Sequence, residues 1–134
     1  MGDREAAIRK LGVGDIFHGR SQHGTSLTCL VTALDGDTIQ ARRITTQDAL
    51  QFDRETGRQL GRGGGTIDCV TPFPPEIHSA FSELDRKYQA FGEMRRRGVE
   101  PDPEQYKLTP AEVRALLSID DHTSSHPISR SVSE

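Results

Sequence analysis

The sequence predicts a mainly β protein of the α+β class, with a small antiparallel barrel or rolled sheet of about five to six short strands. Three observations predict this class. Short β-branched runs between turn residues fill the first half of the chain, apolar residues at steps of three and four follow, and the C-terminal end is polar. We divide the chain into residues 1–73 (barrel with a short N-terminal helix), 74–98 (amphipathic helix), 99–119 (linker and short helix) and 120–134 (disordered tail).

The composition limits both the core and the partners. With 33% hydrophobic and 28% charged residues in 134, the chain has enough apolar residues for a modest core, and part of it is expected to stay unpacked. The net charge is −3, but residues 1–73 carry nine Lys/Arg against nine Asp/Glu. A neutral barrel disfavours nucleic acid as the partner.

A hairpin over Ser26–Ile44 is the centre of the predicted sheet. Two apolar runs meet at Asp35-Gly36-Asp37, and strand side chains alternate faces with a period of two. The Asp-Gly pair is typical of a two-residue turn. We prefer a three-residue loop, because it sets apolar residues opposite each other: Ala33 opposite Ile39, and Val31 opposite Ala41.

The second strand of this hairpin loses its alternation near its end. Without a correction, Arg43 would fall on the apolar face and Ile44 on the polar face. We therefore predict a β-bulge at Arg42-Arg43, which would turn both arginines outward and return Ile44 to the core.

The remaining strands are shorter. A helix over Arg4–Leu11 precedes a strand at Ile16–Arg20. Leu50 and Phe52 mark another strand, after which residues 53–57 form a turn closed by glycine. Residues 58–60 are a short return strand, Gly61–Gly65 is a flexible loop, and residues 66–71 form the last strand.

The clearest helix is Glu76–Arg97. Prolines at 72, 74 and 75 end the sheet, as a rigid spacer or as an extended ligand segment, and Gly98 ends the helix. A continuous stripe of apolar side chains follows the helix and must be covered, either by the barrel or by a second copy of the chain. The stripe that we predict as this interface consists of Ile77, Phe81, Leu84, Tyr88 and Phe91.

A second, shorter helix is expected near the C-terminus. Thr109-Pro110-Ala111-Glu112 is a capping box with proline at the first helical position, and the helix runs to about Ser118. From Asp120 onward the chain is rich in serine and poor in apolar residues, which is typical of a disordered tail.

The two cysteines indicate the compartment. Cys29 and Cys69 lie in predicted strands, and no basic-then-apolar signal segment or membrane-length apolar run is present. We expect buried thiols in a cytoplasmic chain, with a disulfide as the alternative.

For most residues that could take part in catalysis or metal binding, the sequence favours a structural role. Gly61–Gly65 precedes a strand-like segment and not a helix, which favours a connector over a phosphate-binding loop. His18, His23, Cys29 and Asp15 lack zinc-ligand spacing, and His122 and His126 are expected to be solvated. We predict no catalytic residues, metal or cofactor.

The arginines are the one candidate binding set. Phosphate contacts would require these side chains to form one stripe, with the end of the long helix beside the hairpin. The set consists of Arg42, Arg43, Arg62, Arg95, Arg96 and Arg97.

The strand spacing over residues 12–71 is similar to that of SH3-like small barrels, with a polar early loop, tight hairpins and a closing strand. The resemblance implies a scaffold for binding. We therefore expect a non-catalytic cytoplasmic binding or adaptor protein that recognises another protein through barrel edge and helix surfaces, with a homodimer as one form of this. The alternative is a weak, sequence-independent nucleic-acid binder that uses the arginines. No membrane partner is expected.

Overall fold

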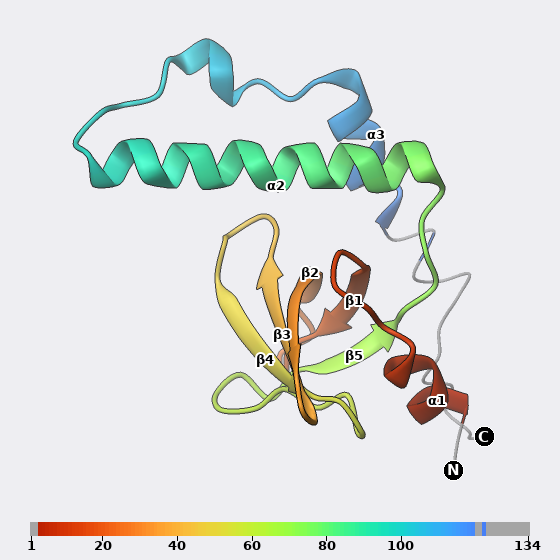
Figure 1. The fold of residues 1–134 in the computed structure, drawn as a ribbon. Coiled ribbons are helices and arrows are strands. Elements are labelled where there is room, and N and C mark those ends of the chain that lie inside the picture. Colours follow the sequence, from red (N-terminus) through yellow and green to blue (C-terminus); the bar gives the residue numbers. More distant parts are fainter. Residues whose placement is uncertain (1–2, 120–121, 123–134) are drawn as a thin grey trace.

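The computed structural model describes residues 3–119 and 122. In this part of the chain, a curled five-stranded antiparallel sheet with strand order β4-β3-β2-β1-β5 lies beneath one long helix (Figure 1). The mainly β class is confirmed. The tail predicted for residues 120–134 lies, apart from His122, outside the described residues. The elements in chain order are α1 (Asp3–Arg9), β1 (Ile16–Arg20), β2 (Ser26–Asp35), β3 (Thr38–Arg43), β4 (Ala49–Asp53), β5 (Thr66–Cys69), α2 (Pro75–Arg96), the 3-10 helix η1 (Pro103–Tyr106) and α3 (Pro110–Leu117).

The central hairpin forms where the sequence predicts it, but its turn is one residue shorter. Asp35 pairs with Thr38, so the turn consists of Gly36 and Asp37 alone. Gly36 takes a φ of 61°, as expected for a glycine at the first position of a type II′ turn. The three-residue loop was therefore the wrong choice.

The pairing of the two strands is correct on one side of an irregularity and wrong on the other. Val31 faces Ala41 as predicted, but Ala33 faces Gln40 and not Ile39. The register shifts between Val31 and Ala33, which is a β-bulge in β2.

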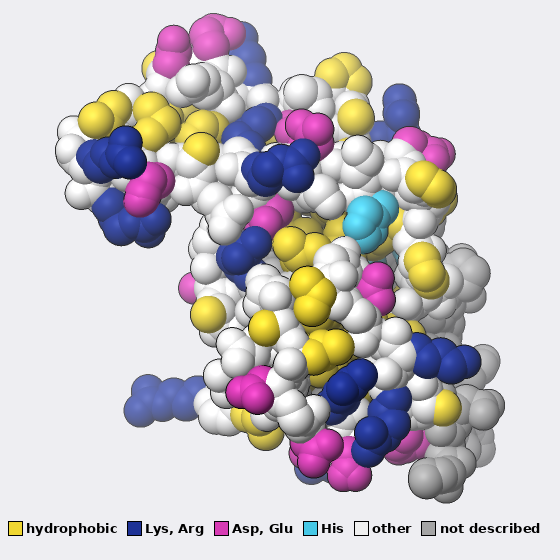
Figure 2. Space-filling model, viewed as in Figure 1, with side chains coloured by type: hydrophobic (Ala, Val, Ile, Leu, Met, Phe, Trp, Pro, Cys, Tyr) yellow, Lys and Arg dark blue, Asp and Glu magenta, His cyan; other side chains and the backbone are white. Residues whose placement is uncertain are grey.

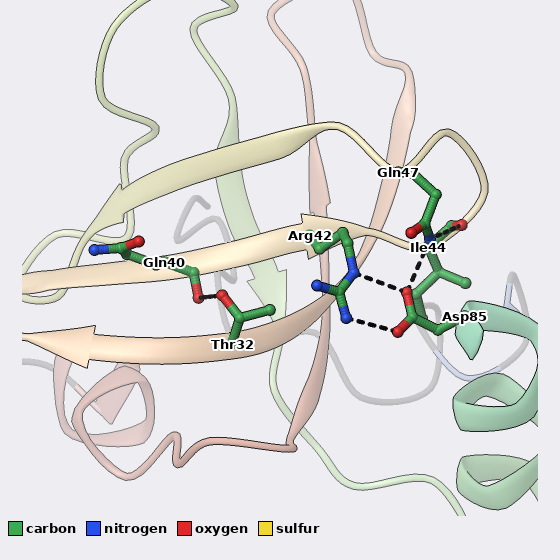
Figure 3. A network of polar contacts seen from close by, with 6 residues as sticks. All are labelled: Thr32, Gln40, Arg42, Ile44, Gln47 and Asp85. Atoms are coloured by element: carbon green, nitrogen blue, oxygen red, sulfur yellow. Dashed lines mark hydrogen bonds and ion pairs between the residues drawn. The ribbon is translucent and has the colours of Figure 1, made fainter. Parts of the chain in front are cut away.

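This bulge at Thr32 has a clear packing consequence. The shift brings Leu34 opposite Ile39. Leu34 then packs against the core inside the curl of the sheet, the inner core, in place of the smaller Ala33. Thr32 is exposed, and its hydroxyl donates to the Gln40 carbonyl at 3.1 Å (Figure 3).

The bulge predicted at Arg42-Arg43 is absent. Arg42 pairs with Leu30 and Arg43 with Cys29 in regular register. Ile44 is fully buried nevertheless, because it joins a second core on the outer face of the sheet, which we call the outer core. The alternation did not need a correction, since both faces of the sheet are covered at this end.

The inner core fills the curl of the sheet. Phe17 and Phe52 meet edge to face with their ring centroids 5.2 Å apart, and Ile8 of α1 and Leu11 just after it close the open side. Most of its fully buried members are β-branched or aromatic, and on the strands such side chains suit a pleated surface. They include Phe17, Phe52, Ile8, Ile39, Ile67, Val31 and Cys29. Cys69 is buried as well, and both thiols are free as predicted.

The segment Gly57–Leu60 joins the two edge strands at one end of the sheet. The Arg58 carbonyl accepts from Asp53 of β4, and the Gly57 carbonyl accepts from Ile67 of β5, at 2.8 and 2.9 Å. Gly57 has the positive φ predicted for the turn. Both sheet edges are therefore partly satisfied within the chain, which lowers their tendency to pair with another protein.

Helix α2 covers the outer face of the sheet, and α3 lies along the N-terminal half of α2 (Figure 1). The helix begins and ends one residue before the predicted bounds, and Gly98 adopts the positive φ that ends it. The capping box of α3 is confirmed, with Thr109 accepting from the Glu112 amide at 3.1 Å and Glu112 accepting from the Thr109 amide at 2.9 Å. Among the described residues, no helix is long and apolar enough to cross a membrane.

Candidate functional site

Arg42, a predicted binding residue, holds α2 on the sheet. Its guanidinium donates to both carboxylate oxygens of Asp85, at 3.0 and 2.7 Å (Figure 3). The side chain of Asp85 is 4% exposed and that of Arg42 is 25% exposed. These hydrogen bonds raise the pKa of Arg42 above its ordinary value. The bidentate geometry uses the donors that a phosphate would need.

Gln47 completes this network from the loop between β3 and β4. Its side-chain amide donates to Asp85 at 2.8 Å and to the Ile44 carbonyl at 2.9 Å. Its backbone has a φ of 66°, which a residue other than glycine rarely adopts. The hydrogen bonds hold this strained conformation, so residues 44–48 are fixed against α2.

Asp85 was missed by sequence reasoning, although a signal was present. It lies four residues after Phe81 and one after Leu84, so it belongs to the buried face of the helix. A carboxylate at such a position needs a cationic or hydrogen-bonding partner. The sequence does not show which of the many arginines supplies it.

The other predicted arginines have separate environments. Arg43 donates to the Ser26 carbonyl at 3.2 Å, Arg96 pairs with Glu93 at 3.3 Å, and Arg62 and Arg97 are exposed. The glycine-rich loop that carries Arg62 and the C-terminal end of α2 lie at different ends of the molecule (Figure 1). The described residues therefore bring Arg95, Arg96 and Arg97 together but do not form one stripe from the whole set.

The predicted helix interface is covered within the chain. Ile77, Phe81, Leu84 and Phe91 are buried, and Tyr88 is half-buried. The first three pack in the outer core, together with Ala115 of α3 and residues of the sheet. This stripe leaves little apolar surface for a second copy of the chain.

The described histidines do not form a metal site. Among the described residues, no group of three or more His, Cys, Asp or Glu is placed to hold a metal ion. His18 is buried with its Nδ1 3.1 Å from the Thr28 hydroxyl, and His23 is exposed. Burial and, to a lesser extent, the charge of His122 lower the pKa of His18 to about 4.

One histidine prediction was wrong, and one lies outside the described residues. His122 is half-buried, with its ring centroid 4.1 Å from that of Phe73, and is therefore not a solvated tail residue. Stacking on an aromatic ring that also contacts His18 accounts for this position. His126 is not among the described residues.

Gly61–Gly65 leads into β5, the geometry predicted for a connector. Its backbone packs closely on two glutamines, and the Gly63 carbonyl accepts from the Gln22 amide at 3.0 Å. Because no helix N-terminus follows, the loop lacks the arrangement of amides that a phosphate-binding loop requires.

The outward face of α3 carries the most exposed large apolar side chain of the described residues. Leu117 is 75% exposed, and Val113 and Leu108 are 39% and 38% exposed. With Pro110 and Arg114 they line a shallow hollow of about 600 Å³. Sequence reasoning placed Val113 and Leu117 in a short helix, but it could not tell which of its side chains the fold would leave uncovered.

Comparison of the chain with known protein families, with characterised proteins and with solved structures gave no match. The case for a function therefore depends on the geometry of the surfaces described above.

Proposed function

We propose that this protein is a non-catalytic binding or adaptor protein that recognises another protein through the exposed face of α3. The observation that carries this proposal is the apolar surface around Leu117, Val113 and Leu108. Contiguous apolar surface is costly to leave in water and typically marks an interaction site. The sequence predicts two contact surfaces, the barrel edge and the helix surface. The sheet edges have fewer unpaired backbone groups for a partner to bind, so we prefer the helix surface.

The opposite face of α3 supports this role because it is firmly anchored. Lys87 of α2 donates to the buried Glu112 carboxylate at 2.6 Å and to the Lys107 carbonyl at 3.2 Å. Ala115 is fully buried in the outer core. A short helix held in this way presents its outer side chains with little ordering cost on binding.

The charge around the hollow favours an amphipathic partner helix with acidic residues beside its apolar stripe. Arg114 is the only charged residue among those lining the hollow, and it is exposed. Within residues 110–117 the one carboxylate, Glu112, is already paired with Lys87. A second copy of α3 would therefore bring a second Arg114 and no carboxylate to balance it.

A binding comparison tests this proposal. The full chain is used to isolate candidate partners in the presence of nuclease, and a candidate is then produced alone and its affinity measured by calorimetry. We expect Leu117→Asp to weaken binding by about tenfold or more, because a charge would enter the apolar contact. Leu60→Asp is the matched control, since Leu60 is an exposed leucine of the barrel, 41% accessible.

Two outcomes would overturn the proposal. One is a partner whose affinity is unchanged by Leu117→Asp but reduced by Leu60→Asp. The other is a homodimer in sedimentation that Leu117→Asp dissociates, which would make the occupant a second copy. Arg114→Glu should weaken binding of the expected partner, and a basic substitution among the acidic residues of that partner should restore the binding.

We also propose a cytoplasmic location for this activity. The two thiols, Cys29 and Cys69, are free and buried. Free thiols are typical of a reducing compartment, which supports the assignment.

A further inference from the structure

A second concave site lies between the β3–β4 loop, the C-terminal half of α2 and η1. It has a volume of about 330 Å³, at the lower end of the range for small-molecule pockets. The site is separate from the α3 surface, and its occupant does not depend on the function proposed above. The lining residues that matter for the argument are Thr45, Tyr88, Phe91, Gly92, Arg95 and Tyr106.

Three aromatic rings form the apolar part of this pocket. The ring centroid of Phe91 lies 4.9 Å from that of Tyr106 and 6.1 Å from that of Tyr88. Phe91 is buried, whereas Tyr88 is half-buried and Tyr106 is exposed. Such rings can stack on a planar ligand without reading a specific hydrogen-bond pattern.

The polar part of the pocket is a cation with open donors. Arg95 donates to the Tyr106 hydroxyl at 2.8 Å, and its guanidinium carbon lies 5.7 Å from the centroid of that ring. Among the described residues this hydroxyl is the only hydrogen-bond partner of the Arg95 side chain, and none engages the hydroxyls of Thr45 or Tyr88. A guanidinium with unused donors suits a phosphate or carboxylate.

The charge around the pocket is mixed. Lys and Arg side chains lie over the C-terminal end of α2, with Asp and Glu side chains beside them (Figure 2). Three arginines, Arg95–Arg97, follow one another there, and of the described carboxylates only Glu93 pairs with one of them. Residues 93–107 carry four Lys/Arg and four Asp/Glu, so the case for a phosphate depends on the open donors of Arg95 and not on an excess of positive charge.

Both walls of the pocket are fixed before any ligand arrives. The loop residues are held on α2 by the bond from Gln47 to Asp85. The capping box of η1 at Asp102 and the bond from Arg95 to Tyr106 hold the other side. A preformed site loses less entropy on binding than one that must order itself.

Gly92 keeps the pocket open. A glycine within a helix costs about 0.5–1 kcal/mol of stability relative to alanine. A Cβ at this position would meet no atom closer than the Arg96 Nη1, at 3.8 Å, so alanine would fit without strain. Because Gly92 lines the pocket, a larger side chain there would take up part of its volume.

We propose that this pocket binds a nucleotide: a planar base stacked on the aromatic rings, with its phosphate on Arg95. The base would lie against Tyr88 and Tyr106, and the Thr45 hydroxyl is placed for a further hydrogen bond. A free mononucleotide and one nucleotide of a single strand present the same chemistry, and the experiment below separates these two sources.

The test is a titration of the isotope-labelled full chain with AMP, in which binding is monitored by the NMR shifts of the backbone amides. AMP should shift the amides of residues 45–47 and 88–95. Adenosine and inorganic phosphate, each offering half of the chemistry, should bind about tenfold or more weakly. A six-nucleotide single strand that binds tighter than AMP identifies the strand as the source, and one that binds no tighter identifies the free nucleotide.

Matched variants locate the site. Arg95→Gln should reduce AMP affinity by about tenfold or more, while Arg86→Gln, an exposed arginine elsewhere on α2, should not change it. Gly92→Leu should abolish binding and Gly92→Ala should retain it, with circular dichroism checking that both fold. The proposal is overturned if AMP causes no shifts up to about 10 mM. It is equally overturned if adenosine matches AMP, or if Gly92→Leu binds as well as the wild type.

Discussion

Replacing Asp85 by asparagine tests how α2 is held on the sheet. The substitution keeps the shape of the side chain but leaves Arg42 without its counter-charge. Removing one partner of a buried ion pair costs about 3–5 kcal/mol. Because the side chain of Arg42 is still 25% exposed and can recruit water, we expect a loss at the lower end, about 3 kcal/mol. For a chain of 134 residues this corresponds to a fall in Tm of about 10 °C.

Replacing Arg42, the other partner of the ion pair, should cost more stability. Arg42→Met leaves the Asp85 carboxylate, 4% exposed, with Gln47 as its remaining hydrogen-bond donor. We expect a loss of about 4 kcal/mol. The double variant Arg42→Met/Asp85→Leu removes both charges and should lie within about 2 kcal/mol of the wild type, giving a large coupling energy.

Urea unfolding at pH 7, followed by circular dichroism, measures the four corners of this cycle, which are the wild type, Arg42→Met, Asp85→Leu and the double variant, and measures Asp85→Asn beside them. Glu83→Gln is the control, since Glu83 makes an exposed ion pair with Arg86 that should matter little. A stability of Asp85→Asn within about 1 kcal/mol of the wild type, or a coupling energy near zero, would refute the reasoning.

Two further predictions concern the other buried polar groups. The pKa of His18 is about 4 in the folded chain and 6.5 in the unfolded chain. The contribution of His18 to the free energy of unfolding should therefore be fully present above pH 6.5. It should fall by on the order of 3 kcal/mol toward pH 4, as measured by urea unfolding at a series of pH values. His18→Leu should remove this component of the slope and His23→Gln should not; equal slopes for wild type and His18→Leu would contradict the assignment. Glu112→Ala removes the half of the α3 capping box that accepts from the Thr109 amide, and it removes the partner of Lys87. We expect a loss of about 2 kcal/mol in the free energy of unfolding and faster amide exchange in residues 110–117, while unchanged exchange there would argue against the anchor.

Much of the fold could be predicted because it depends on local patterns. Strand β1 has the predicted bounds, and the capping box at Thr109 fixed the start of α3. The apolar stripe from Ile77 to Phe91 identified α2 to within one residue at each end. Each of these signals lies within a few residues of the feature that it predicts.

The errors arose where the decisive partner is distant in sequence. Ile44 was expected to need a bulge, because nothing local shows that α2 covers the outer face of the sheet. The register shift at Thr32 favours Leu34 over Ala33 in the inner core, which only the packed structure decides. Arg42 was taken as a ligand-binding residue, and its partner Asp85 is 43 residues away.

The candidate surfaces follow the same rule. Arg95 was named from the sequence, but the rings of Tyr88 and Tyr106 become part of its site only when η1 folds back along α2. Leu117 and Leu116 are neighbours in an apolar run, yet Leu116 packs on the outer core and Leu117 faces water. Exposure of this kind depends on where α3 docks, which the pattern alone does not specify.

Amide hydrogen exchange of α2 at two protein concentrations tests the central claim most directly. That claim is that the apolar stripe around Phe81 and Leu84 is covered by the chain's own sheet and α3. We predict protection of these amides as strong as in β2, and unchanged over a roughly hundredfold range of concentration. Weak protection at low concentration that rises on concentrating the protein would contradict the claim, because the stripe would then be covered by a second copy.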